Sequence, residues 1–313
     1  MAGTFGRRYC FVLTAPLMRP LIRPNLVNFC LAAGVLVMAT ACFWSADRPE
    51  SDSPDVYVDD ANSNAAPAAN SDPAVPGKKK DEGDFLVEHL EIETPRYKEI
   101  DRQVRDARLL EDAAEKLNEA LILPRNIVLR TKDCKEVNAF YDAGDRSVTM
   151  CYELMEHFYR TFKSTGMPDE KAYVKMNDAV RFVFLHEIGH ALIDQYKLPI
   201  AGNEEDAADR CSAYINLKEL GDNGLRAVYA AADAFAIESK QGDNSRRNLA
   251  DEHLLREQRF YNSLCMIYGS SPGKHEDIVS EGYLPKERAV RCQGEYQRAV
   301  NSWVKLLEPW RKN

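Results

Sequence analysis

Two histidines and a glutamate in the middle of the chain have the types and the spacing of a metal centre. His186 and His190 are four residues apart, and Glu187 follows the first of them in the sequence HEIGH. On a helix, residues four positions apart stack on one face, so both imidazoles can reach one ion while Glu187 projects beside it. The HExxH pattern is typical of zinc hydrolases. We therefore predict that both histidines bind zinc and that Glu187 is a catalytic base.

This geometry requires a helix, and the flanking sequence predicts one. From 179 to 193 the chain reads AVRFVFLHEIGHALI, which is apolar almost all round and contains no proline. That composition is typical of a buried helix. Gly189 costs about 1 kcal/mol relative to alanine in mid-helix. We expect it where another backbone comes close, at the floor of the metal site.

A catalytic zinc needs a third protein ligand and leaves one position open for water. After a turn signal, Asn203 can cap a second helix that begins EEDAADR. Glu205 and Asp209 share a face of that helix, so Glu205 can bind zinc while Asp209 accepts the second N–H of a ligand histidine. We predict one zinc ion per chain, bound by Glu205 and the two histidines, and favour Glu205 over Glu204 and Asp206. The alternative is that the acidic first turn only caps the helix.

The N-terminal part of the chain carries targeting signals. Arginines precede an uncharged apolar run from about 27 to 41, which is too short to span a membrane comfortably and is typical of a signal peptide. The small residues before Cys42 resemble a bacterial lipoprotein processing site, so we predict a signal peptide over 1–42 and a lipid on Cys42. Ordinary cleavage after Ala41 and an uncleaved anchor are the alternatives. All three place the protein outside the cytoplasm, in the cell envelope or periplasm, and we favour membrane attachment through the N-terminus.

The segment 43–84 consists mostly of Asp, Ser, Pro, Ala and Asn, followed by lysines, and predicts a disordered tether. The folded part is then one domain over 85–313. The net charge of −8 is shared between an acidic tether and a mixed domain without a dense basic stripe. This disfavours nucleic-acid binding. We expect a peptide or protein substrate as the partner.

Five cysteines fall within the predicted domain, and an exported protein meets an oxidising compartment. Cys134 and Cys151 flank a predicted hairpin, and Cys265 and Cys292 flank a connection between two C-terminal helices. We therefore predict these two disulfides and a buried, free Cys211. None of the five has the CxxC spacing of zinc-binding thiolates.

The remaining periodicity predicts an α+β domain. Helical spacing covers about 101–121, a strand follows at 127–131, and the arms of a hairpin span 138–142 and 147–151. Helices dominate from 152 to the end of the chain. A small sheet ahead of the HExxH helix, followed by a mostly helical body, is the expected architecture.

Three of these segments resemble the gluzincin zinc peptidases, namely HEIGH, the ExxxD helix after it and the upstream sequence NAFY. The resemblance implies a zincin-like fold. In thermolysin-like members the matching Asn-Ala strand pairs with the substrate, which implies a substrate-binding role for Asn138 and Ala139. An exposed strand edge also offers sequence-tolerant main-chain hydrogen bonds to a peptide. The alternative for Asn138 is an ordinary turn residue.

The segment from about 85 to 310 resembles an uncharacterised family of exported bacterial metallopeptidases. The segments that carry this resemblance are DC, NAFYD, CYEL, HEIGHAL, EEDAAD, DEH and RFYN. His253 and Arg259 are spaced like the histidine and arginine that follow the zinc helices of integral-membrane prenyl-protein peptidases. That similarity implies that His253 steadies the oxyanion and that Arg259 orients the Glu205 region or the substrate carbonyl. The proline that follows this histidine there is absent here, and a surface helix residue is the alternative for His253.

The predicted reaction is zinc-promoted hydrolysis of peptide bonds. Zinc lowers the pKa of its water from about 15.7 toward about 7, and Glu187 takes the proton as the water attacks the carbonyl. One alternative is an envelope binding or scaffold protein that retains a zinc site. Glu187 argues against it, because a structural site needs no general base. The other alternative is a zinc hydrolase that acts on non-peptide cell-wall amides. The Asn138–Ala139 strand argues against it, because such a strand favours an extended peptide as the substrate.

Overall fold

The structure is a computed structural model that describes residues 79–240 and 253–312. All of these residues belong to one compact unit, Asn70–Asn313. The predicted signal peptide, Cys42 and most of the predicted tether lie outside the described residues. Within the described ranges, no helix combines the length and the apolar character needed to cross a membrane.

Residues just ahead of the expected boundary at residue 85 are bonded to the domain. The Glu82 N–H donates to the Leu123 carbonyl at 2.8 Å. The Asp84 N–H donates to the Asn126 side chain, also at 2.8 Å. The last residues of the predicted tether are therefore hydrogen-bonded to the segment at 123–126.

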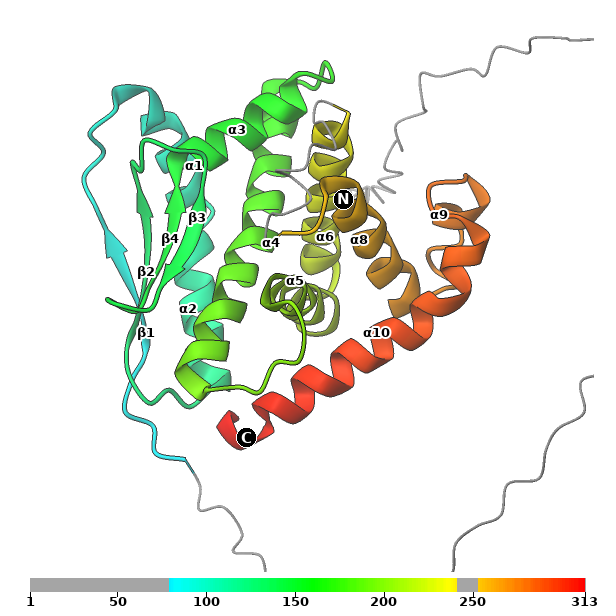
Figure 1. Cartoon of the computed structure of the whole chain (residues 1–313). Coiled ribbons are helices and arrows are strands. Elements are labelled where there is room, and N and C mark those ends of the chain that lie inside the picture. Colours follow the sequence, from blue (N-terminus) through cyan, green and yellow to red (C-terminus); the bar gives the residue numbers. More distant parts are fainter. Residues whose placement is uncertain (1–78, 241–252, 313) are drawn as a thin grey trace, which may run out of the picture. The chain divides into compact units, whose positions relative to one another are not determined.

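Four strands form one mixed sheet in the order β1-β2-β4-β3 (Figure 1). They are β1 (Phe85–His89), β2 (Ile127–Lys132), β3 (Ala139–Asp142) and β4 (Ser147–Cys151). β1 pairs with β2 and β2 with β4 in parallel, whereas β3 pairs with β4 as the predicted antiparallel hairpin. β1 was not predicted from the sequence. β3 lies at the edge of the sheet, and it packs against the helix that carries the HExxH motif.

The crossover from β1 to β2 contains η1 (Pro95–Tyr97), α1 (Lys98–Asp106) and α2 (Leu109–Ala120). The sequence predicted one helix over 101–121, but the chain breaks at Arg108, which has a left-handed φ of 48°. The break changes the helical phase, and Leu109 and Leu110 on α2 are buried together with Val104 on α1. Burial of these apolar residues overrides the continuous helical pattern.

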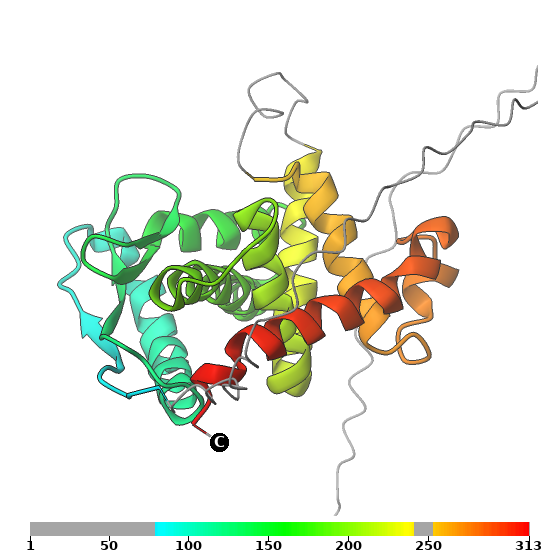
Figure 2. The same cartoon turned by 60° about the horizontal axis from the view of Figure 1, so that its bottom comes forward.

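Helices make up the rest of the domain, which confirms the predicted mostly helical α+β architecture. They are α3 (Tyr152–Lys163), α4 (Asp169–Tyr196), α5 (Glu204–Tyr214), the π-helical turn η2 (Ile215–Glu219), α6 (Gly221–Ser239), α8 (Arg256–Ser270), α9 (Asp277–Ser280), α10 (Lys286–Leu307) and η3 (Glu308–Trp310). α4 packs against α3, α5 and α6, and α10 packs against α5 and α8 (Figures 1 and 2).

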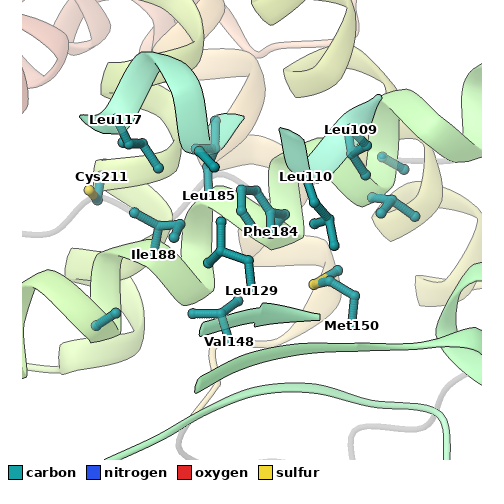
Figure 3. Packing of buried hydrophobic residues seen from close by; sticks show 14 of the residues in the cluster. Leu109, Leu110, Leu117, Leu129, Val148, Met150, Phe184, Leu185, Ile188 and Cys211 are labelled. Atoms are coloured by element: carbon teal, nitrogen blue, oxygen red, sulfur yellow. The ribbon is translucent and has the colours of Figure 1, made fainter. Parts of the chain in front are cut away.

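The main core fixes α4 between the sheet and its neighbouring helices. Figure 3 shows Phe184, Leu185 and Ile188 of α4 among side chains of α2 and of the sheet, such as Leu117 and Leu129. All five are at most 8% exposed. Burying a side chain of this size stabilises the fold by about 1.5–3 kcal/mol. The segment just before and within the HExxH motif is therefore held rigidly.

Both predicted disulfides are present in the structure. Cys134 before β3 is bonded to Cys151 at the end of β4, and Cys265 of α8 is bonded to Cys292 of α10. Cys211 is a free thiol and is fully buried. Burial raises the pKa of that thiol, so it acts as a small apolar group in the core.

Candidate metal centre

The three predicted zinc ligands converge at the junction of α4 and α5. The Nε2 atoms of His186 and His190 are 3.2 Å apart. Glu205 places Oε2 at 3.1 Å from His186 Nε2 and Oε1 at 3.4 Å from His190 Nε2. Donor atoms on a tetrahedral zinc, each about 2.0–2.2 Å from the ion, lie about 3.3–3.6 Å apart. Two imidazoles and one carboxylate at this spacing fit a zinc ion.

Local sequence explains why Glu205 reaches this position. The Asn203 side chain accepts hydrogen bonds from the N–H groups of Glu205 at 2.7 Å and Asp206 at 3.4 Å, as a helix N-cap does. α5 therefore starts where it was predicted to start, with Glu205 in its first turn.

Gly189 allows α5 to approach α4 closely, as predicted. A Cβ atom added at this position would lie 3.1 Å from the Ala208 Cα and 3.1 Å from the Cys211 Cβ. These contacts are tighter than ordinary van der Waals packing, and one of them is to backbone. The glycine thereby sets the short distance between the histidines and Glu205.

Asp209 holds the outer nitrogen of the first histidine. Its Oδ1 is 2.8 Å from His186 Nδ1, which leaves Nε2 of that ring facing the proposed metal position. Arg259 donates from Nε and Nη2 to both oxygens of Asp209, at 2.9 Å and 2.7 Å. Burial raises the pKa of Asp209, but the Arg259 charge and the hydrogen bond with His186 outweigh it and lower this pKa. Of the roles implied for Arg259, its contact with α5 corresponds to orientation of the Glu205 region.

From the sequence, Glu204 was only a competitor of Glu205 as a metal ligand. The structure instead places it behind His190. His190 Nδ1 lies 2.7 Å from Glu204 Oε1, which mirrors the contact between His186 and Asp209. Asp206, the other competing residue, instead accepts a hydrogen bond from Arg210 at 2.7 Å. The sequence carries no clear signal for this role, because neighbouring positions on a helix do not share a face, and the contact depends on how α5 packs against α4.

Glu187 lies beside the ligands with only 7% of its surface exposed. Burial raises its pKa, while the two neighbouring histidines lower it less strongly. The backbone N–H of Tyr141 faces the carboxylate and lowers this pKa slightly. This contact was not predicted. A buried carboxyl with a raised pKa suits a group that accepts and returns a proton.

The predicted substrate-binding residues lie at the edge of the sheet, next to α4. The Cys151 N–H donates to the Asn138 carbonyl at 3.2 Å, so the main chain of Asn138 faces β4. In an antiparallel pair, the main-chain N–H and C=O groups of successive residues alternately face the partner strand and face away from it. Those of Ala139 and Tyr141 therefore point away from β4. On this outer side the Tyr141 N–H faces Glu187. The N–H and C=O of Ala139 point outward at the strand edge.

His253 lies at the same centre, although it is distant in sequence. Its Nε2 is 2.9 Å from Glu205 Oε2, and its ring is stacked with that of His186 at 6.1 Å between centroids. Donor atoms of these three residues all lie within 4.8 Å of one another. The side chain is half exposed, so it can meet a molecule that enters from solvent.

The predicted ligands influence one another's protonation. Burial raises the pKa of Glu205, but hydrogen bonds from the three surrounding histidines outweigh it and lower this pKa strongly. Burial lowers the pKa of His186, but hydrogen bonds with Asp209 and Glu205 outweigh it and raise this pKa to about 9. The carboxylates therefore stay ionised, which is the state in which they bind a metal ion.

Two cavities, of about 370 Å³ and about 830 Å³, adjoin the centre. Both are lined by Asn138, Ala139, His186, Glu187 and His253. The first continues over α3, the end of α6 and the start of α8, and the second over β3 and the start of α5. The centre and the strand edge are therefore accessible from both sides.

The chain was also compared with known proteins. A family profile described as "Putative metallopeptidase" matches residues 89–307, which is more than half of the chain. Comparisons with curated proteins and with solved structures find no match.

Proposed function

The chain belongs to this metallopeptidase family, and from that premise we propose that it is a zinc-dependent peptidase of the cell envelope. The observation that carries the proposal is the arrangement of two imidazoles and one carboxylate at metal-binding distances beside a buried glutamate. An exposed strand edge and two open cavities adjoin this group. Family membership supports a peptidase, while zinc, the mechanism and the location are our inferences.

In the proposed mechanism a peptide pairs with the outward main-chain groups of Ala139 at the strand edge. Bound zinc would lower the pKa of a water to about 7 and polarise the substrate carbonyl. Glu187 accepts the proton of the attacking water and returns it to the leaving amine. His253 donates to the oxyanion, a contribution of about 2.7–4 kcal/mol in comparable sites. Asp209 and Glu204 keep the ligand imidazoles oriented.

Glu187 also distinguishes this proposal from a scaffold protein with a structural zinc site. A structural site closes its fourth position with a protein ligand and needs no base. Here the carboxyl with the raised pKa is buried next to both cavities. That placement favours proton transfer over a purely structural role.

The experiment is to purify the exported protein, measure its zinc content and assay hydrolysis of an unfolded protein substrate. We expect one zinc per chain, and Glu187→Gln should retain the zinc and lose hydrolysis. Glu170→Gln is the matched control, because Glu170 is an exposed residue in the first turn of the same helix. A Glu187→Gln variant that hydrolyses at the wild-type rate would refute the mechanism.

The envelope location rests on the sequence. We propose that Cys42 is lipid-modified and that the following segment tethers the domain to the membrane. The two disulfides support an oxidising compartment, since such bonds are rare in the cytoplasm.

A further inference from the structure

A second cluster of charged residues lines the smaller cavity. Glu238 at the end of α6 places Oε1 at 2.8 Å from His157 Nε2 of α3, and Arg256 of α8 donates from Nε to Oε2 at 2.7 Å. All three residues line the cavity that also contains His186 and Glu187. One carboxylate therefore joins three helices beside the proposed catalytic centre.

Glu238 is suited to hold these helices rather than to bind a ligand. Its side chain is 11% exposed, and each of its two oxygens already has a partner. Burial raises the pKa of Glu238, but the hydrogen bonds with His157 and Arg256 outweigh it and lower this pKa. The carboxylate is thus ionised and engaged on both sides.

Arg256, one member of this cluster, follows His253 by three positions in the sequence. Residues 253–255 have no helical or strand structure and lead directly into α8. The first turn of that helix is held at two points, by Arg256 on Glu238 and by Arg259 on Asp209. His253 reaches Glu205 from a half-exposed position, so its placement depends on where this first turn is fixed.

We propose that Glu238 is a positioning residue that anchors Arg256 and thereby places His253 against the metal centre. This inference deepens the proposed function and rests on it only for the catalytic consequence. The placement of His253 is a property of the fold and can be measured without any substrate.

The test compares Glu238→Ala and Arg256→Ala with Asp233→Ala in the full exported protein. Asp233 lies on the same helix as Glu238 and forms an ion pair with Lys175 of α4. It is 47% exposed and contacts neither the cluster nor the metal ligands in the structure. Arg256 is 55% exposed, so its variant keeps the test valid if Glu238→Ala fails to fold.

The first readout is amide hydrogen exchange of peptides that cover 253–262. We expect at least about fivefold faster exchange at this segment in both cluster variants and no change in the control. Wild-type exchange in Arg256→Ala would overturn the proposal. Because this readout needs no substrate, it decides the placement of His253 even if the wild-type protein hydrolyses no peptide.

The second readout is steady-state kinetics with unchanged zinc content. Misplacement of a catalytic group by about 1 Å can cost 10²-fold, so kcat should fall about 10- to 100-fold in both cluster variants while KM changes little. In a His253→Ala background, Glu238→Ala should add less than about twofold, because both changes remove the same placed group. If the losses of kcat in His253→Ala and Glu238→Ala multiplied in the double variant, the proposal would be overturned. A raised KM at unchanged kcat would also overturn it, because Arg256 would then act on the substrate directly.

Discussion

Removal of Arg259 tests whether the buried ion pair behind His186 holds the metal centre together. Arg259→Met keeps the apolar stem but leaves the Asp209 carboxylate without its cation. The side chains of Arg259 and Asp209 are 14% and 19% exposed, so water screens the attraction between their charges only partly. Breaking a buried pair from one side costs about 3–5 kcal/mol. We expect the lower end, about 3 kcal/mol, because His186 still contacts Asp209.

The assay is thermal unfolding of the metal-free protein. A loss of about 1 kcal/mol lowers Tm by about 2–4 °C in a domain of this size, so Arg259→Met should lower Tm by about 6–12 °C. Arg210→Met is the matched control, because Arg210 pairs with Asp206 on the same helix and both are 31% exposed. A partly exposed pair at this i,i+4 spacing contributes about 0.3–0.5 kcal/mol, or about 1–2 °C.

A double variant separates the ion pair from simple loss of packing. Adding Asp209→Asn to Arg259→Met removes a carboxylate that has already lost its Arg259 partner, so the double variant should lose less stability than the sum of the two single variants. The zinc affinity of Arg259→Met should also fall about 10- to 100-fold, because Asp209 no longer orients His186 firmly. Equal Tm values for Arg259→Met and Arg210→Met would refute the reasoning.

Three further predictions follow from the same geometry. Glu204→Ala should weaken zinc binding about 10-fold while Asp206→Ala leaves it unchanged, as measured by competition with a chelator; equal effects would contradict the outer role of Glu204. The raised pKa of His186, about 9, contributes stability to the metal-free protein that is complete below about pH 6.5 and is lost as the pH rises through 9. Zinc must displace that proton, so affinity should instead rise with pH up to 9, and a pH-independent affinity would show that His186 is neutral in the metal-free protein. Cys42→Ser should release or misprocess the protein, as judged by membrane fractionation and mass spectrometry; an unmodified Cys42 in a chain that retains residues 24–41 would establish the uncleaved anchor instead.

The proximity of the predicted ligands could be anticipated because their spacing is local. His186 and His190 are four positions apart, as are Glu205 and Asp209, and this spacing places each pair on one helix face whatever surrounds them. The cap at Asn203 is local as well, and the structure has it at the predicted residue.

Other features depend on contacts between distant segments. β1 is followed by two helices before β2, and a parallel pairing of this kind leaves no turn signal in the sequence. The contact of the Tyr141 N–H with Glu187 depends on how the sheet edge meets α4. The alternative for His253 was a surface helix residue, but the structure places it just before α8, outside any helix or strand, where it meets Glu205 of a segment far away in the sequence.

The metal centre is built from the same contacts as the helix packing, so mutations in the core should act on the site. A side chain at Gly189 would press on the Ala208 backbone and move α5 away from α4. The His186 side of the centre is anchored by Asp209 and a buried Arg259, whereas the carboxylate behind His190 is 52% exposed. The His186 side is therefore fixed by the fold, and the His190 side has more freedom to adjust.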